Sequence, residues 1–179
     1  MVVKPAFLHG TLGTHVHLEL INSRDSIAAA YAVEVAASRS PGGWRFGRAE
    51  PEFDAYQRLF IGSTQWPCLV RSNGTGDVLG LTFLVGTDCR TMSGQLVAVR
   101  AGEMQKTFHF LAGVGRYINF IFEEINLAGI TMVANAASRS ACEALIERGA
   151  GQRLCNDEIM IRAETWRAAW PNLIRAVAR

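Results

Sequence analysis

The sequence predicts an α/β fold in which one mixed sheet is flanked by helices. Three observations predict this fold. Several short runs alternate apolar and polar residues as half-buried strands do, longer runs repeat apolar residues every three or four positions as helices do, and turn residues separate the two kinds of run. A chain of 179 residues can bury a substantial core, so we expect a single domain over residues 1–179.

Composition and charge exclude several classes of protein. The net charge is +2 and the Lys and Arg residues are scattered, which is too weak a field for a surface that binds nucleic acid. Residues 1–10 lack the charged segment and the apolar length of a signal peptide, and no apolar stretch is long enough to span a membrane. We therefore expect a cytoplasmic protein that binds neither nucleic acid nor a membrane.

The cysteines and histidines predict no metal site. His15 and His17 lie on one face of the first predicted strand, but no third ligand is near them in the sequence. The four cysteines are irregularly spaced and include no C-x-x-C pair, which favours buried free thiols over zinc ligands. They are Cys68, Cys89, Cys142 and Cys155.

The N-terminal half of the chain predicts a strand, two helices and a hairpin. In order, these elements are a strand at 15–21, helices at 26–37 and 50–60, and strands at 66–71 and 78–85. Asn22, Ser23 and Asp25 supply the turn and the N-cap before the first helix. The segment 72–77 contains an Asn-Gly pair, which favours a hairpin turn, so the two strands that it joins should pair antiparallel.

The C-terminal half predicts strands that alternate with helices. In order, these are a loop at 86–94, a strand at 95–100, a helix at 107–126, a strand at 130–134, a helix at 138–148, a strand at 157–162 and a helix at 166–177 that is broken near Pro171. The helix at 107–126 has the clearest pattern, because its apolar residues recur at steps of three and four. The strands on either side of it should be parallel, with a right-handed crossover.

Three segments of the chain and the order of its predicted elements resemble a known family. The segments are 16–25 (VHLELINSRD), 122–127 (FEEINL) and 157–166 (DEIMIRAETW). Together they resemble the GNAT acyltransferase superfamily, in the branch that contains the ribosomal-protein N-terminal acetyltransferases. The resemblance implies a GNAT-like fold whose mixed sheet is splayed between the fourth and fifth strands. Few residues separate Gly151 from Asp157, so we expect the sixth strand to be short or missing.

The resemblance implies acetyl-CoA or another acyl-CoA as co-substrate, with no metal. The thioester would lie nearest to Val97, Ala98 and Val99 on the fourth strand. Asn135 and Ser138 would reach the pantetheine arm, although both residues also suit a turn and a helix cap.

The resemblance also implies a pyrophosphate site at the start of the third helix, where backbone N–H groups and the helix dipole attract phosphate. The expected loop comprises Gln105, Lys106, Thr107, Phe108 and His109. Gln105 matches the family pattern, but Lys106 and Phe108 replace its two glycines, so the loop is degenerate. Gly113 and Gly115 offer a second placement, which would shorten the helix, and we prefer the first.

The sequence does not assign a general base. Acyl transfer from a thioester needs a deprotonated amine and an N–H donor for the carbonyl oxygen. The resemblance implies a carboxylate at the start of the fourth strand, where this chain has Gln95, and an amide cannot act as a base. Glu103 and His109 are the other candidates, although a solvated loop explains Glu103 and packing explains His109. Four aromatic residues either line an acceptor pocket or pack in the protein: Tyr31, Trp44, Phe46 and Tyr117.

These observations predict an enzyme, an N-acyltransferase that moves an acyl group, here acetyl, from acyl-CoA to a primary amine of a small molecule or a peptide N-terminus. Two alternatives stay open. The replaced glycines and Lys106 suit a donor that is presented by an acyl carrier protein. Gln95 and the altered loop suit a non-catalytic binding or assembly protein with the same fold. The sequence does not decide whether the chain forms a homodimer.

Overall fold

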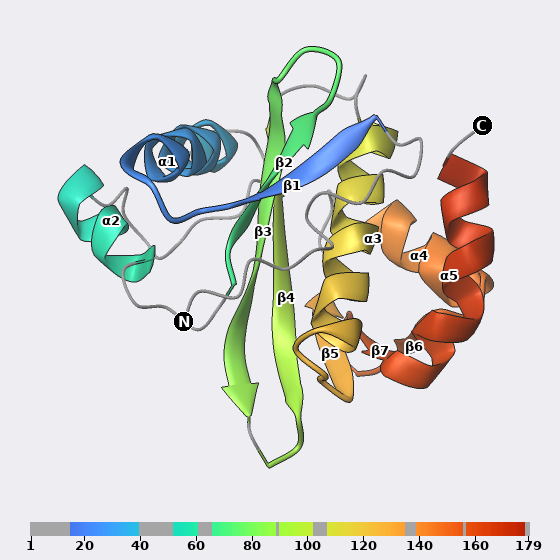
Figure 1. Ribbon diagram of the computed structural model, residues 1–179. Coiled ribbons are helices and arrows are strands. Elements are labelled where there is room, and N and C mark those ends of the chain that lie inside the picture. The colour runs from blue at the N-terminus through green and yellow to red at the C-terminus, as the bar shows by residue number, and fades with distance from the viewer. Residues whose placement is uncertain are drawn as a thin grey trace.

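The computed structural model describes residues 15–39, 52–60, 66–88, 90–101, 107–134, 139–155 and 157–177. Within these ranges the chain forms one seven-stranded sheet and five helices (Figure 1). The strands are β1 (Val16–Leu20), β2 (Cys68–Ser72), β3 (Val78–Asp88), β4 (Ser93–Arg100), β5 (Gly129–Val133), β6 (Gln152–Arg153) and β7 (Glu158–Arg162). The helices are α1 (Arg24–Arg39), α2 (Phe53–Phe60), α3 (Thr107–Glu123), α4 (Arg139–Glu147) and α5 (Ala163–Val177).

The sheet is mixed, as the sequence predicts. Its strand order is β1-β2-β3-β4-β5-β7-β6. The pair β4 and β5 is parallel and the other neighbours are antiparallel. The helix between β4 and β5 is α3, so the predicted strand, helix, strand unit is confirmed. The predicted hairpin between β2 and β3 is confirmed as well.

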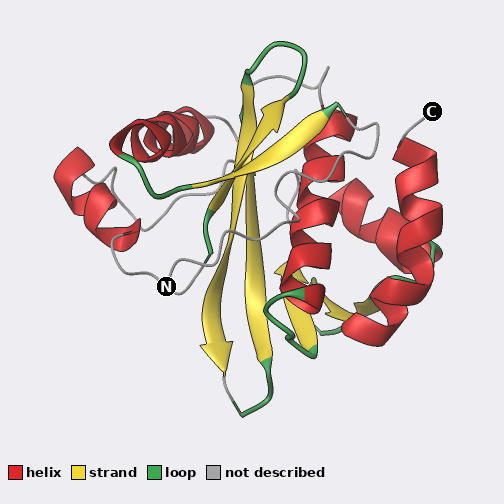
Figure 2. Cartoon of the chain, viewed as in Figure 1, coloured by secondary structure: helices red, strands yellow, loops and turns green. Residues whose placement is uncertain are grey.

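Helices cover the two faces of the sheet unequally. Helices α1 and α2 lie on one side, and α3, α4 and α5 lie on the other (Figures 1 and 2). Helix α1 packs on β3 and β4, whereas α3 crosses β1, β2, β3 and β4 and also contacts α5. The core is accordingly divided into two clusters, one under α1 and α2 and a larger one under α3, α4 and α5.

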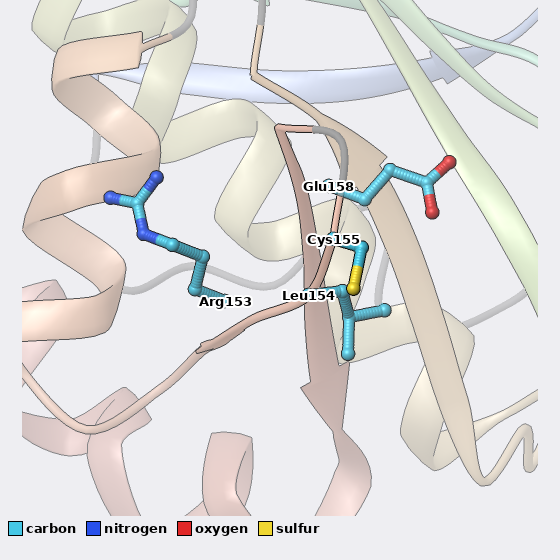
Figure 3. Close-up of a pocket in the computed structure, with 4 residues that line it drawn as sticks. All are labelled: Arg153, Leu154, Cys155 and Glu158. Carbon is cyan, nitrogen blue, oxygen red and sulfur yellow. The ribbon is translucent and has the colours of Figure 1, made fainter.

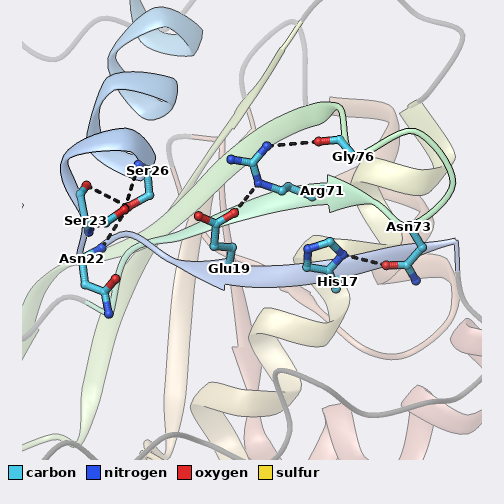
Figure 4. Close-up of polar contacts among 8 residues, drawn as sticks. All are labelled: His17, Glu19, Asn22, Ser23, Ser26, Arg71, Asn73 and Gly76. Atoms are coloured by element: carbon cyan, nitrogen blue, oxygen red, sulfur yellow. Dashed lines mark hydrogen bonds and ion pairs between the residues drawn. The ribbon is translucent and has the colours of Figure 1, made fainter.

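Hydrogen bonds from side chains fix the start of α1 and the edge of the sheet. The Ser26 backbone N–H donates to Ser23 Oγ at 3.1 Å, and the Ser23 backbone N–H donates to Ser26 Oγ at 3.0 Å. This reciprocal cap satisfies backbone groups that a helix start leaves without partners. Beside it, Glu19 of β1 forms an ion pair with Arg71 of β2, and His17 is hydrogen-bonded to Asn73 at 2.6 Å (Figure 4).

The ends of β3 and α3 differ from the prediction by three residues each. The loop predicted at 86–94 is shorter, because β3 continues to Asp88 through an irregularity in its pairing after Val85. Helix α3 ends at Glu123, before the predicted end at residue 126. Asn126 has a φ of 61°, a left-handed conformation that asparagine tolerates and that closes a helix.

The predicted break at Pro171 is wrong, because α5 continues through it to Val177. Trp166 and Trp170 stack at a ring-centroid distance of 5.1 Å, and Trp166 is buried. A proline inside a helix costs about 3 kcal/mol. Burial of a large aromatic side chain contributes a comparable free energy, of roughly 3 kcal/mol. The packing of both indole rings on the cluster under α3, α4 and α5 therefore offsets the free-energy cost of proline inside the helix.

Candidate functional site

Strands β4 and β5 separate along their length, as the splayed fold predicts. Their pairing comprises Ser93 with Gly129, Gly94 with Ile130, and Gln95 with Thr131. Strand β4 then continues to Arg100 and β5 to Val133, with no further pair between them. In an open α/β sheet, the carboxyl ends of two parallel strands that part in this way are the usual ligand site, and the space between the ends of β4 and β5 is termed the crevice.

Val97, Ala98 and Val99 lie on the part of β4 beyond this separation. Val97 and Val99 pack into the cluster under α1 and α2, whereas Ala98 packs into the cluster under α3. Because these side chains are directed above and below the sheet, the strand presents its backbone at the crevice. A backbone N–H is the donor that acyl transfer needs for the thioester oxygen.

The first turn of α3 lies over the beginning of β3 and the end of β4. A Cβ atom added to Gly80 would lie 2.4 Å from the Phe110 ring and 2.4 Å from the Val99 carbonyl oxygen. The helix start is therefore next to the part of β4 that forms the crevice. The first four N–H groups of a helix have no intrahelical partner, and they form an anion site with the helix dipole.

Several predicted site residues lie outside the described residues. These are Glu103, Gln105, Lys106, Asn135, Ser138 and the aromatic residues Trp44 and Phe46. The backbone of Thr107 and Phe108 forms the first turn of α3, which agrees with the predicted helix start.

His109 is directed toward β1 rather than toward β5. Its ring lies 5.1 Å from the ring of His15, which precedes β1. Strand β1 is three strands from β4 in the sheet, or about 14 Å at the usual spacing between strands. This position favours a packing role for His109 over a catalytic role at the crevice.

Gly113 and Gly115 lie inside α3, where they allow close packing. A Cβ atom added to Gly113 would lie 2.2 Å from Val70 of β2, and one added to Gly115 would lie 2.7 Å from Trp170 of α5. These glycines bring the helix against the sheet and against α5. The second placement of the phosphate loop therefore does not fit, because α3 already begins at Thr107.

A row of side chains crosses the sheet at the last pair of β4 and β5. Gln95 is opposite Thr131, which is in turn opposite Met160 of β7. All three side chains are half-buried. Their neighbours Ile130, Ile159 and Ile161 are buried in the cluster under α3. Since side chains alternate along a strand, the row faces the opposite side of the sheet, which α1 covers at β3 and β4.

A surface depression of about 630 Å³ lies beyond this row, around the turn between β6 and β7. It is lined by Arg153, Leu154, Cys155 and Glu158 (Figure 3). Strand β6 has only two residues, so the expectation of a short sixth strand is confirmed. Glu158 opens β7 and is paired with Val133, the last residue of β5.

Glu34 is a buried carboxyl group that the sequence analysis missed. Its side chain is 6% exposed, and Tyr56 Oη of α2 donates a hydrogen bond to its Oε1 at 3.0 Å. Burial raises the pKa of Glu34 to about 7, although the hydrogen bond from Tyr56 acts in the opposite direction. A signal was present, since Glu34 is in register with Ile27 and Ala30 on the apolar stripe of α1.

The two described aromatic candidates for an acceptor pocket are packing residues. Tyr117 is fully buried in the cluster under α3. Tyr31 is half-buried, and its ring lies 5.5 Å from Phe53 and 5.2 Å from Tyr56. Tyr117 therefore packs in the core beneath α3, and Tyr31 packs between α1 and α2.

The described ranges contain neither a cluster of metal-ligand side chains nor a membrane-spanning helix. No group of three or more His, Cys, Asp or Glu side chains there is arranged to hold a metal ion. Likewise, no described helix combines the length and the apolar character that crossing a membrane requires.

Comparison with known proteins gives matches at the level of structure. No family model matches the sequence, and no curated protein matches it. A chimera of the Vibrio cholerae spermidine N-acetyltransferase SpeG and hSSAT matches 87% of this chain and 99% of its own, with a TM-score of 0.64 and 15% identity. A mutant of SpeG from Vibrio cholerae matches 86% of this chain and 96% of its own, with a TM-score of 0.64 and 16% identity.

A third solved structure is the Vibrio cholerae spermidine/spermine N-acetyltransferase SpeG in complex with manganese ions. It matches 87% of this chain and 97% of its own, with a TM-score of 0.63 and 13% identity. Identities this low establish a common fold rather than a common activity. The α/β architecture, the mixed sheet and the separation of β4 from β5 are thus those of the GNAT fold.

Proposed function

We propose that this chain is an N-acyltransferase that transfers an acetyl group from acetyl-CoA to a primary amine of a small molecule. The observation that carries the proposal is the separation of β4 and β5 after Gln95 and Thr131 in a sheet of this fold. The likeness to spermidine N-acetyltransferases supports a small-molecule amine over a peptide N-terminus.

The crevice suits an extended acyl-CoA arm. The arm carries amide groups, and the strand backbone from Leu96 to Arg100 can pair with such groups as it would with another strand. In this arrangement, a backbone N–H of residues 97–99 polarises the thioester carbonyl. The N–H groups at the start of α3 suit the pyrophosphate, although Phe108 replaces a glycine of the family pattern.

The reaction forms a C–N bond and breaks the C–S bond of the thioester. The nitrogen of the ammonium form loses two protons to a base or to water and keeps one in the amide, and the leaving thiolate gains one. Gln95 does not supply the base, and Glu103 stays a prediction. Membership of the ribosomal-protein branch also stays a prediction, as does the alternative that an acyl carrier protein presents the donor.

Calorimetry with acetyl-CoA tests the proposal most directly. We expect saturable heat with acetyl-CoA, and an acetylated product by mass spectrometry when a panel of primary amines is added. Absence of heat with acetyl-CoA and with longer acyl-CoA esters would contradict it. Turnover of acyl carrier protein thioesters without turnover of CoA esters would favour the carrier-protein alternative, and no product with either donor would favour a non-catalytic protein.

A further inference from the structure

Glu158 lies beside the crevice on the side of the sheet that α3 does not cover. It is paired with Val133, and the two residues stand beyond the row in which β4 and β5 last pair. Ile159 is buried in the cluster under α3. Because side chains alternate along β7, Glu158 extends to the opposite side. Figure 3 shows its carboxylate and the Arg153 guanidinium extending in opposite directions.

The Glu158 carboxylate differs from the other half-buried carboxylates of the described chain. Glu19 forms an ion pair with Arg71, and Glu143 forms one with Arg153. The carboxylate of Asp157, the residue before Glu158, lies 3.7 Å from the Arg139 guanidinium. Glu158 has no such partner among the described residues, so its negative charge is available to a ligand.

Two exposed apolar residues are the backbone neighbours of Glu158. Val133 is 44% exposed and lies directly opposite Glu158, where paired side chains are in contact range. Leu154 is 37% exposed, and its backbone N–H donates to the Glu158 carbonyl oxygen at 2.7 Å. Both belong to the few large apolar side chains that are exposed in the described part of the chain.

A half-buried carboxylate with an exposed apolar residue on each neighbouring segment fits a ligand with one positive charge and an aliphatic chain. The ammonium group supplies the charge-assisted hydrogen bond that the carboxylate lacks. The chain covers apolar surface that is otherwise in water. One available carboxylate matches one ammonium group, which favours a monoamine over a polyamine with several charges.

We propose that Glu158 binds the ammonium group of the acceptor, and that Val133 and Leu154 contact its aliphatic chain. This inference rests on the proposed function, because it names the acceptor of that reaction as an alkylamine. Glu158 then acts as a binding residue at the mouth of the crevice: it holds the ammonium form of the acceptor, and the nitrogen attacks the thioester only after it has left this ion pair and lost a proton. Its loss should weaken binding of the amine and leave binding of acetyl-CoA unchanged.

Cys155 provides a probe of this site that does not depend on turnover. It is exposed and lines the same depression as Glu158. Cys68 and Cys142 are buried and should react slowly. The rate of alkylation by iodoacetamide can be followed at residue 155 by mass spectrometry of peptides. We expect n-hexylamine to slow this rate, and n-hexanol, which has the same chain without the charge, to have little effect.

Glu158→Gln separates the charge from the shape of the side chain. The concentration of n-hexylamine that halves the alkylation rate should rise about tenfold in this variant, as expected for loss of one charged hydrogen bond. Glu164→Gln removes an exposed carboxylate at the start of α5 and should leave the wild-type value unchanged. Circular dichroism checks that both variants are folded, and Glu158→Ala is a second variant if the first is not.

Three outcomes would overturn the inference. They are no protection of Cys155 by n-hexylamine, equal protection by n-hexanol, and equal protection of Glu158→Gln and the wild type. Calorimetry with acetyl-CoA, run in parallel, tests the proposed function alone. Acetyl-CoA binding without protection by the amine would reject only the role of Glu158, whereas protection without acetyl-CoA binding would reject only the proposed function.

Discussion

The Tyr56 hydroxyl donates a hydrogen bond of 3.0 Å to Glu34, and this bond joins α2 to α1 inside the protein. Tyr56 is fully buried in the cluster that separates the two helices from the sheet, and Glu34 is buried as well. A carboxyl group in this position binds its proton more tightly than it does in water.

The stability of the protein should fall as pH rises through neutrality. The pKa of Glu34 is raised from 4.5 to about 7 by burial, so the folded state binds the proton more tightly than the unfolded state. The stabilisation is fully present below pH 4.5 and is lost as pH rises through 7, with a total of about 3 kcal/mol. Urea unfolding at pH 5 and pH 8 measures it. Glu34→Gln should remove this part of the pH dependence, and the same dependence in both proteins would reject the assignment.

Tyr56→Phe should destabilise the protein more at pH 8 than at pH 5. At the higher pH Glu34 is ionised, and the substitution leaves a buried carboxylate without its hydrogen bond. The expected loss at pH 8 is about 2 kcal/mol, and roughly half of that at pH 5, where the carboxyl is neutral. Urea unfolding of the variant at both pH values gives the comparison. A loss that is independent of pH would mean that the hydroxyl does not interact with the charge.

Gly113→Ala should destabilise the protein although alanine favours helices. Helix propensity alone predicts a gain of about 1 kcal/mol, but the added Cβ would lie 2.2 Å from Val70 of β2. We expect a net loss of about 2 kcal/mol from overpacking. The double variant Gly113→Ala/Val70→Ala should lose less stability than the two single variants lose in sum. The smaller side chain at position 70 leaves room for the Cβ atom added at position 113.

Gly74→Ala is the matched control for that prediction. A Cβ atom added to Gly74, in the turn between β2 and β3, meets no atom within 4 Å. The free energy of unfolding of the Gly74→Ala variant should stay within about 0.5 kcal/mol of the wild-type value. Equal losses at positions 74 and 113 would show that the contact with Val70 is not the cause.

Thr107→Pro should weaken acetyl-CoA binding without unfolding α3. Proline is well tolerated at the first position of a helix, but it removes one of the N–H groups proposed to face the pyrophosphate. We expect the Kd from calorimetry to rise about tenfold. Arg24→Pro makes the same change at the start of α1 and should leave the Kd unchanged. Unaltered binding by Thr107→Pro would contradict the proposed pyrophosphate position.

Local patterns were sufficient to predict most of the elements. The helix from Thr107 was predictable because its apolar residues repeat at helical spacing over several turns, and the hairpin at 72–77 because turn residues separate two apolar runs. The continuation of α5 through Pro171 was not predictable, since it depends on the burial of Trp166 in the cluster under α3 and on the contact of Trp170 with Gly115 of α3. These contacts join α5 to another helix, so the sequence of α5 alone does not predict them.

The candidate site divides in the same way. Residues 97–99 were assigned to the crevice from a family resemblance, and the register of β4 with β5 places them beyond the last pair. The burial of Glu34 depends on α1, α2 and the sheet together, whereas Glu158 has no ion-pair partner in the described part of the chain because Arg153 pairs with Glu143 and Arg139 with Asp157. Neither property can be predicted from a single strand or helix.

The short parallel contact between β4 and β5 also divides the sheet mechanically. Strands β1 to β4 form one part of the sheet, and β5, β7 and β6 form the other. In the described residues the two parts are joined by only three paired positions. A ligand bound between them would act as an additional strand and couple the unfolding of the two parts. Such a ligand stabilises the whole molecule in proportion to the logarithm of its concentration above the Kd.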